Sequence, residues 1–355
     1  MDGLSRVISA LDRGIGKKEI HRHDHQVWLR GDSLKPPPRI SFIIVNFNTK
    51  ECLARCLTAI LKHATPNHQI IVVDNASNDG SPELVKGDFQ EAQLISLETN
   101  RGYSAAVNEG FKIADSEFIF IINSDVYIQE DTVEILVDYL RSFDDVGLVG
   151  PAQLSLNNRP MLTIHHDLNL LNEFLEAILL WDVWRYRVFR WRIAGQINSP
   201  REVSWLSGAA LMVRSSLMED VGGMDENLFM YGEEYDLQVR CRKKGWRIVY
   251  VPMSRVFHEK GVSADAYFGY HRLAAITKSH YYVIAKNGGL KMLIVTVPLR
   301  IIRSIIRLLL GLFLWFWKPK TATLHGLEHL EVLKLSLSRS TYRWILKKLR
   351  NGAPK

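Results

Sequence analysis

The sequence predicts an α/β fold with a mostly parallel central sheet and a helical C-terminal extension. Between residues 39 and 287, short apolar runs alternate with stretches of helical periodicity, and turn residues separate them. Alternating strands and helices are typical of βαβ units, whose strands pair in parallel. Several apolar runs are followed directly by Asn, Asp or Gly. We therefore expect polar side chains at the carboxyl ends of the strands, where open α/β sheets bind their ligands.

The elements of this sheet follow one another along the first part of the region. Short apolar and β-branched runs predict strands at residues 40–45, 69–73, 94–97 and 117–122. Apolar residues at three- and four-residue spacing predict helices at 50–63, 81–89 and 104–114. The loops 74–80 and 100–102 are rich in Asn, Asp, Ser and Gly, which favour turns. A later strand is expected at 247–251.

Three segments are expected along the chain: an N-terminal extension at 1–38, the α/β domain at 39–287 and a basic amphipathic helical region at 288–355. Consecutive prolines at 36–38 mark the first boundary, because they stiffen the chain. Residues 1–31 lack the apolar stretch of a signal peptide, so we expect the protein to stay in the cytoplasm. Cys52, Cys56 and Cys241 are too few for a disulfide scaffold and are expected to be buried and reduced.

Positive charge is concentrated near the C-terminus. The formal charge is +7, but 14 of the 45 Lys and Arg and only 2 of the 38 Asp and Glu lie from Ala285 onward. The rest of the chain is therefore mildly acidic. Because the basic residues alternate with aliphatic ones and form no nucleic-acid-binding motif, nucleic acid is not an expected partner.

An apolar stretch at 299–317 predicts contact with a membrane surface. Arg300, Arg303 and Arg307 fall within a narrow arc of this helix and make spanning costly, and the uninterrupted run 308–317 is too short to span. We expect a helix that begins after Pro298 and lies in the interface, with Trp315 and Trp317 at headgroup depth and the basic tail attracted to anionic lipids. This predicts peripheral association with the inner face of the plasma membrane. A core helix of a soluble domain is the alternative.

Residues 168–193 are dense in Leu, Trp and Arg. An amphipathic helix that covers the core would explain this composition. A lid over an acceptor or a contact with lipid headgroups would explain it equally well, since Trp and Arg are enriched at interfaces. The composition does not separate these alternatives.

Two acidic clusters about 110 residues apart carry the candidate chemistry. Asn123-Ser124-Asp125 directly follows an apolar run, which places Asp125 at the carboxyl end of a strand. A carboxylate there can hold a divalent cation against a diphosphate. The second cluster, at 233–236, can supply a general base, and His258 follows it. Together they predict transfer of a group from a nucleotide-activated donor.

Seven motifs resemble, in order, the signature of family 2 glycosyltransferases with the GT-A fold, a Rossmann-like sheet flanked by helices. They are 44–49 (IVNFNT), 72–80 (VVDNASNDG), 100–108 (NRGYSAAVN), 123–125 (NSD), 205–210 (WLSGAA), 222–226 (GGMDE) and 229–237 (FMYGEEYDL). The last two motifs and His258 are similar to the rhamnosyltransferase-like branch. The resemblance covers about residues 39–287.

The resemblance implies a donor site formed by Asn46, Asn48, Asp74, Asn75, Gly102, Asn108, Asn123 and Asp125. In the family, the aspartate that matches Asp74 accepts the imide N–H of uracil or thymine; the alternative is that Asp74 caps the following turn. Gly102 would let the backbone approach the ligand, although a plain turn explains it nearly as well. Trp205, Gly208 and Ala209 are expected to form the wall of the acceptor site.

The implied cofactor is Mg²⁺ or Mn²⁺, held by Asp125 and His258. Family members usually present Asp-x-Asp or Asn-x-Asp here, so Asn123 offers an amide in place of a second carboxylate. His258 matches a position that adds an imidazole ligand in some relatives; a structural histidine is the alternative. A mixed set of carboxylate, imidazole and diphosphate suits either cation.

The implied general base is Glu234, at a position where the family usually has an aspartate. Glu233 and Asp236 are the alternatives, and Asp236 is expected rather to anchor the loop and position Arg240. The base would deprotonate the acceptor hydroxyl as that oxygen attacks the anomeric carbon, so one displacement inverts this centre.

The branch suggests dTDP-L-rhamnose as the nucleotide-sugar donor, with a UDP-linked hexose or N-acetylhexosamine as the alternative. The expected acceptor is a lipid-linked or polysaccharide glycan, and the sequence predicts no oligomeric state. The departures at Asn123 and Glu234 leave open a different class: a non-catalytic protein that binds a nucleotide sugar or scaffolds glycan assembly.

Overall fold

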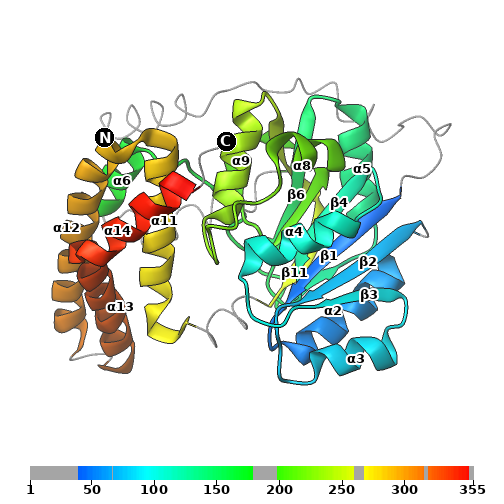
Figure 1. The fold of residues 1–355 in the computed structure, drawn as a ribbon, viewed down its shortest axis with the longest axis horizontal. Helices are drawn as coiled ribbons and strands as arrows, with labels where there is room; N and C mark the ends of the chain where they lie inside the picture. Colours follow the sequence, from blue (N-terminus) through cyan, green and yellow to red (C-terminus); the bar gives the residue numbers. More distant parts are fainter. Residues whose placement is uncertain (1–38, 66, 179–197, 260–267, 316–318, 352–355) are drawn as a thin grey trace.

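The computed structural model describes residues 39–65, 67–178, 198–259, 268–315 and 319–351. The predicted extension at 1–38 lies outside these residues, as do Trp317 and the part of the 168–193 segment beyond Ile178. Within them, an α/β part and a group of C-terminal helices lie side by side, as Figure 1 shows.

A nine-stranded sheet forms the centre of the α/β part, in the order β3-β2-β1-β4-β10-β6-β11-β5, with β8 paired to β11. The strands are β1 (Ile40–Asn46), β2 (His68–Asp74), β3 (Ala92–Ser96), β4 (Phe118–Asn123), β5 (Val126–Ile128), β6 (Val146–Leu154), β8 (Arg201–Glu202), β10 (Ala210–Arg214) and β11 (Arg247–His258). Strands β1 to β4 pair in parallel, and β11 is parallel to β6. Between them, β10 runs antiparallel to both β4 and β6. A separate two-stranded sheet pairs β7 (Ile164–His165) with β9 (Trp205–Leu206).

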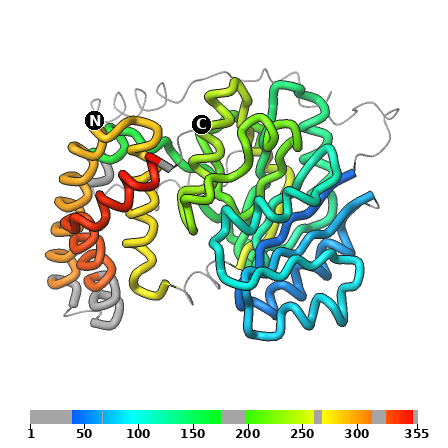
Figure 2. The backbone as a smooth tube through the Cα atoms, in the orientation of Figure 1, coloured from blue at the N-terminus to red at the C-terminus, as the bar shows by residue number. Residues whose placement is uncertain are grey.

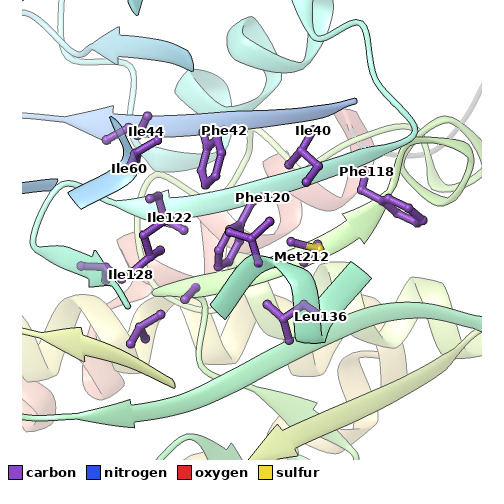
Figure 3. Close-up of a cluster of buried hydrophobic side chains, with 14 of the residues drawn as sticks. Ile40, Phe42, Ile44, Ile60, Phe118, Phe120, Ile122, Ile128, Leu136 and Met212 are labelled. Carbon is purple, nitrogen blue, oxygen red and sulfur yellow. The ribbon is translucent and has the colours of Figure 1, made fainter. Parts of the chain in front are cut away.

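Helices cover both faces of this sheet. On one face, α2 (Lys50–His63), α3 (Ser81–Asp88) and α5 (Thr132–Ser142) enclose a core that includes Phe42, Phe120 and Leu136 (Figure 3). On the other face, α4 (Tyr103–Ile113), α8 (Ser215–Val221) and α9 (Glu233–Lys243) enclose a second core. The α/β class with a mostly parallel sheet is confirmed. The antiparallel strand β10 was not predicted.

The C-terminal helices pack on one another and against the α/β part. They are η3 (Gly269–His271), α11 (Arg272–Gly288), α12 (Leu290–Trp315), α13 (Pro319–Leu337) and α14 (Arg339–Asn351), and α6 (Leu170–Ile178) lies against α12. The tube view in Figure 2 shows how α11 runs between these helices and the sheet. Tyr281 and Tyr282 of α11 are fully buried in a third core, which also contains Trp205 and Ile345. The helical C-terminal extension is confirmed, whereas its boundary at 287/288 stays a prediction.

The predicted start of the long helix was wrong. Pro298 lies inside α12, which begins at Leu290, so the predicted start after Pro298 is nine residues late. The arginine stripe faces the protein, since Arg300 is buried and forms an ion pair with Glu173 of α6 through its Nε at 2.8 Å. The exposed side of α12 carries aliphatic residues instead, among them Ile294, Ile302, Leu309 and Leu312. Among the described residues, no helix combines the length and hydrophobicity that crossing a membrane requires.

Candidate active site

A cavity of about 210 Å³ lies at the carboxyl ends of β1, β2 and β4. It is lined by nine of the residues that the sequence singled out for donor, acceptor, metal or base roles: Asn75, Gly102, Asn123, Asp125, Gly208, Ala209, Glu233, Glu234 and His258. Its position agrees with the expectation that ligands bind at this edge of the sheet.

A second cavity, of about 840 Å³, lies between the α/β part and the C-terminal helices. Its wall includes Trp205, the hairpin residues 155–162, and side chains of α11, α12 and α13. Five residues line both cavities: Ser207, Tyr231, Glu234, His258 and Arg272. Glu234 therefore lies where the two cavities meet, which is the position from which one carboxylate can reach groups bound in both.

Asp125 and His258 come together at the ends of neighbouring strands. Oδ1 of Asp125 lies 3.5 Å from Nε2 of His258, and both side chains are buried. Strand pairing explains the encounter, because His258 at the end of β11 pairs with Val126, the residue after Asp125. Nδ1 of His258 lies 3.1 Å from Oε1 of Gln153; in the tautomer that donates to this oxygen, the Nε2 lone pair faces Asp125.

This pair fits a divalent cation. A carboxylate oxygen and an imidazole lone pair that face each other are both electron-rich, so a cation between them relieves their mutual repulsion. The described residues contain no group of three or more His, Cys, Asp or Glu side chains in ligand geometry. A bound ion would therefore take its other ligands from diphosphate oxygens and water, as Mg²⁺ usually does.

Glu233 and Glu234 begin helix α9; Glu233 is buried, Glu234 is half-buried, and both have few polar partners. Burial raises the pKa of Glu234, and burial together with the charge of Glu234 raises the pKa of Glu233 well above its usual range. Oε2 of Glu234 accepts a hydrogen bond from the backbone N–H of Gly232 at 3.1 Å. A carboxylate held in place and raised in pKa is suited to accept a proton near neutral pH.

Neighbouring backbone fixes where Glu234 lies. A Cβ atom added to Gly208 would meet Cβ of Glu234 at 2.9 Å, so only glycine allows this approach. Gln238, one turn later, donates to the carbonyls of Leu206 and Glu234 and accepts from the N–H of Leu206 at 2.8 Å. These hydrogen bonds hold the start of α9 against strand β9.

Asp74 organises the loop that follows β2. Its Oδ1 accepts from the N–H of Ser77 and its Oδ2 from Nδ2 of Asn46, each at 2.8 Å. Asn48 accepts from the N–H of Asn78 and completes the loop. Asp74 and Asn46 are buried and, like Asn48, are not among the residues lining either cavity. These contacts are those of a turn cap, and the contact of Asp74 with a donor base stays a prediction.

Gly102 is a close-approach position. Its φ of +86° is accessible to glycine, and a Cβ there would collide with the backbone carbonyl of Phe229. The next residue, Tyr103, donates its N–H to that same carbonyl at 2.7 Å. Asn75 accepts from the N–H of Arg101 and donates to the carbonyl of Gly102, so it holds this loop at the cavity wall.

Two of the predicted site residues hold loops together. Asn108 donates from Nδ2 to the carbonyl of Met224 at 2.9 Å and accepts from the N–H of Met224 at 2.8 Å. It lines neither of the two cavities. Asp236 is fully buried and pairs with Nε of Arg240 at 2.8 Å and with Nζ of Lys286 at 2.7 Å. Arg240 in turn donates to the carbonyls of Val221 and Gly223. These are anchoring positions.

Trp205 lies in the wall of the larger cavity. Its indole N–H donates to the carbonyl of His166 at 2.6 Å, and its ring stacks on His165 with centroids 4.3 Å apart. Gly208 and Ala209, predicted with it as the acceptor wall, line the smaller cavity instead. The sequence reasoning missed Gln153, Tyr231 and Arg272. Of these three, only Tyr231 could have been found from the sequence, because it lies inside the motif at 229–237.

The Asp125–His258 pair, which fits a cation, and the carboxylate of Glu234 lie together at the carboxyl ends of the strands. This combination is typical of glycosyltransferases of the GT-A type. A mannosyltransferase from Pyrobaculum calidifontis, solved with GDP-mannose and Mn²⁺, has a similar fold with a TM-score of 0.53 and 17% sequence identity. The similarity covers 87% of this chain and 91% of that one. The family model described as glycosyl transferase family 2 matches residues 41–220, about half of the chain. The chain belongs to this family and is a glycosyltransferase.

Two curated relatives differ in the reaction that their names describe. An N-acetylglucosaminyl-diphospho-decaprenol L-rhamnosyltransferase of Mycobacterium tuberculosis is 29% identical over 258 residues, 68% of this chain and 83% of that protein. A poly-beta-1,6-N-acetyl-D-glucosamine synthase of Staphylococcus epidermidis is 23% identical over 222 residues, 59% of this chain. The match covers half of the length of the second relative. The resemblance to family 2 and to its rhamnosyltransferases is confirmed.

Proposed function

We propose that this protein is a metal-dependent inverting glycosyltransferase that moves a sugar from a pyrimidine nucleoside diphosphate to a hydroxyl of a lipid-linked or polysaccharide acceptor. The observation that carries the proposal is the position of Glu234, a half-buried carboxylate where the two cavities meet. The donor would occupy the smaller cavity and the acceptor the larger one. The rhamnosyltransferase relative favours dTDP-L-rhamnose as the donor, and the synthase relative favours a UDP-linked N-acetylhexosamine.

In this mechanism each residue has one task. Asp125 and His258 would hold Mg²⁺ or Mn²⁺, which when bound neutralises the charge of the departing diphosphate. Glu234 takes the proton from the acceptor hydroxyl while that oxygen attacks the anomeric carbon from the face opposite the diphosphate. Asn123 and Asn75 line the donor side as neutral hydrogen-bonding amides. The contacts of Asn46, Asn48, Asp74, Asn75 and Gly102 keep the donor-side loops in place.

Removing the Asp125 carboxylate should weaken metal binding. In a calorimetric titration with Mn²⁺ and saturating UDP or dTDP, we expect Asp125→Asn to raise the Kd at least about tenfold. Release of the nucleoside diphosphate should fall with it. Asp115→Asn, at an 85% exposed side chain that precedes β4 at the end of the strand opposite to Asp125, is the control and should bind Mn²⁺ normally. Equal Mn²⁺ affinity in Asp125→Asn and the control would remove Asp125 from the metal site.

The exposed aliphatic side of α12 supports a peripheral association with the cytoplasmic face of the plasma membrane. Leu309 and Leu312 are 62% and 68% exposed, and Ile302 adds a third large side chain to the stripe. Leu171 and Phe174 of the neighbouring α6 are also exposed. A helix with aliphatic residues on its outer side and arginines on its inner side can insert the outer side into an interface. The basic residues of α14, such as Lys347 and Lys348, would add attraction to anionic lipid.

Replacing three residues of the stripe should release the protein from lipid. We expect the triple variant Ile302→Gln, Leu309→Gln, Leu312→Gln to bind phosphatidylglycerol vesicles at least about tenfold more weakly in a flotation assay, because each large aliphatic side chain contributes about 1.5–3 kcal/mol when fully buried. The double variant Leu61→Gln, Ile113→Gln changes equally exposed residues of the α/β part and is the control. Full retention of the triple variant on vesicles would exclude α12 as the membrane contact.

A further inference from the structure

The wall of the larger cavity is rich in cationic groups. Four arginines and five histidines line it: Arg159, Arg272, Arg300, Arg303, His165, His166, His258, His280 and His329. Among the described residues, two acidic side chains line the same cavity, Glu234 and Glu259. The lining therefore has more arginines than carboxylates before any histidine is protonated.

Some of these charges already have partners within the protein. Glu259 pairs with Arg55 at 2.5 Å and accepts from the hydroxyl of Tyr127 at 2.8 Å. Arg300 pairs with Glu173, and burial and the charge of Arg300 lower the pKa of the neighbouring His280 to about 3, so that this imidazole is neutral. Arg159, Arg272 and Arg303 line the same wall from other parts of the chain.

These three arginines reach the cavity from three separate elements. Arg303 comes from α12, Arg272 from the start of α11, and Arg159 from the loop after β6. The guanidinium of Arg272 lies over the ring of Tyr231, 5.7 Å from its centroid. Arg272 lines both cavities, as Tyr231 and Glu234 do. The three arginines therefore line one cavity, which meets the smaller cavity at Glu234.

The rest of the wall is apolar. Met161, Leu162, Leu168, Leu273, Ile276 and Val332 line it between the arginines. A volume of about 840 Å³ is within the usual range for ligand sites, about 300–1,000 Å³. Guanidinium groups match phosphate oxygens in geometry and charge. A ligand that combines a phosphate with sugar and hydrocarbon parts fits this lining.

We propose that the larger cavity binds the phosphate or diphosphate group of the acceptor, with Arg303, Arg272 and Arg159 as its ligands. The acceptor sugar would then lie between this group and Glu234. The proposal rests on the proposed function, since it names the acceptor of that reaction as a phosphorylated glycan carrier. It assigns the C-terminal helices a role in substrate choice besides membrane contact.

Binding of a small diphosphate tests the proposal without any chemistry. The probe is citronellyl diphosphate, titrated calorimetrically into the full chain in the presence of Mn²⁺ and saturating UDP or dTDP, which together occupy the donor side. We expect wild-type protein to bind it and to bind citronellol far more weakly. Arg303→Gln should raise the Kd by about 10–100-fold, the usual worth of a hydrogen bond between charged groups, and Arg303→Lys should restore part of the affinity.

A matched control lies on the same helix. Arg307→Gln makes the same change of charge at a residue of α12 that does not line the cavity, and it should leave the Kd unchanged. Thermal melting of each variant establishes that it is folded. Equal probe affinity in wild type and Arg303→Gln would overturn the proposal. A loss of binding to phosphatidylglycerol vesicles with unchanged probe affinity would also overturn it, because the arginine would then face lipid headgroups.

The two proposals fail in different ways. Probe binding that depends on Arg303, in a protein that releases nucleoside diphosphate from no donor, would contradict the transferase mechanism and support the anion site. Transfer to a neutral alkyl glycoside that is as efficient as transfer to the matching glycosyl diphosphate would contradict the anion site and support the mechanism.

Discussion

Glu234→Gln should lower turnover by about 10²–10⁴-fold while leaving donor affinity nearly intact, because the amide keeps the shape of the carboxylate but cannot accept the proton. Burial raises the pKa of Glu234. We therefore also expect the turnover of the wild-type enzyme to fall on the acid side at a higher pH than the usual glutamate pKa of about 4.3 would give. Turnover measured against pH, together with donor affinity by calorimetry, checks both expectations.

Glu233→Gln is the matched control. Burial and the charge of Glu234 raise the pKa of Glu233 well above its usual range, which favours its protonated form, and glutamine resembles that form. We expect Glu233→Gln to keep most of the turnover. The reverse pattern, with Glu233→Gln inactive and Glu234→Gln active, would move the base to Glu233.

The same pKa shift predicts an effect on stability. A folded-state pKa above the unfolded value stabilises the fold fully at low pH, and this contribution is lost as the pH rises through the folded-state pKa. Glu233→Gln should therefore melt at a higher temperature than wild type on the alkaline side, with the difference shrinking toward acid pH.

Asp236→Asn should destabilise the fold by about 3–5 kcal/mol, because removing one partner of a buried ion pair leaves the other charges uncompensated. Asp236 is fully buried and paired with both Arg240 and Lys286, which connect α9, the loop at 221–223 and α11. Urea unfolding followed by circular dichroism measures the loss. Asp115→Asn, which breaks the exposed pair with Arg39, should unfold as wild type does.

Unfolding at the wild-type midpoint, together with lost turnover, would contradict the anchoring role. Asp236 would then act in the reaction itself, which is the alternative role as general base that the sequence suggested.

The local pattern of apolar residues was sufficient to predict most strands of the sheet and the helices that cover it. The helix at 50–63 was predicted with the bounds that α2 has, because its apolar residues follow one helical face. Strand β10 was missed because its antiparallel pairing depends on contacts with β4 and β6, which are distant along the chain. The helix was expected to begin after Pro298, but α12 continues through this proline: Ile294, whose carbonyl loses its partner there, is 74% exposed and open to water.

The candidate site was predictable where it lies on motifs and unpredictable where tertiary contact forms it. Asp125, His258 and Glu234 belong to recognised segments, and strand pairing and the first turn of α9 bring them to one place. The Arg303 and Arg272 side chains could be assigned to the larger cavity only from the packing of α11 and α12. A sequence pattern shows the polar side of a helix but not what that side faces. The arginine stripe was recognised from the sequence, but its contact with Glu173 of α6 was not.

The most direct test is release of nucleoside diphosphate from a panel of nucleotide sugars, with Mn²⁺, with Mg²⁺ and with EDTA. The panel would contain dTDP-L-rhamnose, UDP-N-acetylglucosamine, UDP-glucose and GDP-mannose. The account predicts release from one uridine or thymidine donor that requires the metal and that Glu234→Gln abolishes. Release from GDP-mannose alone, or release that EDTA and Glu234→Gln leave unchanged, would contradict it.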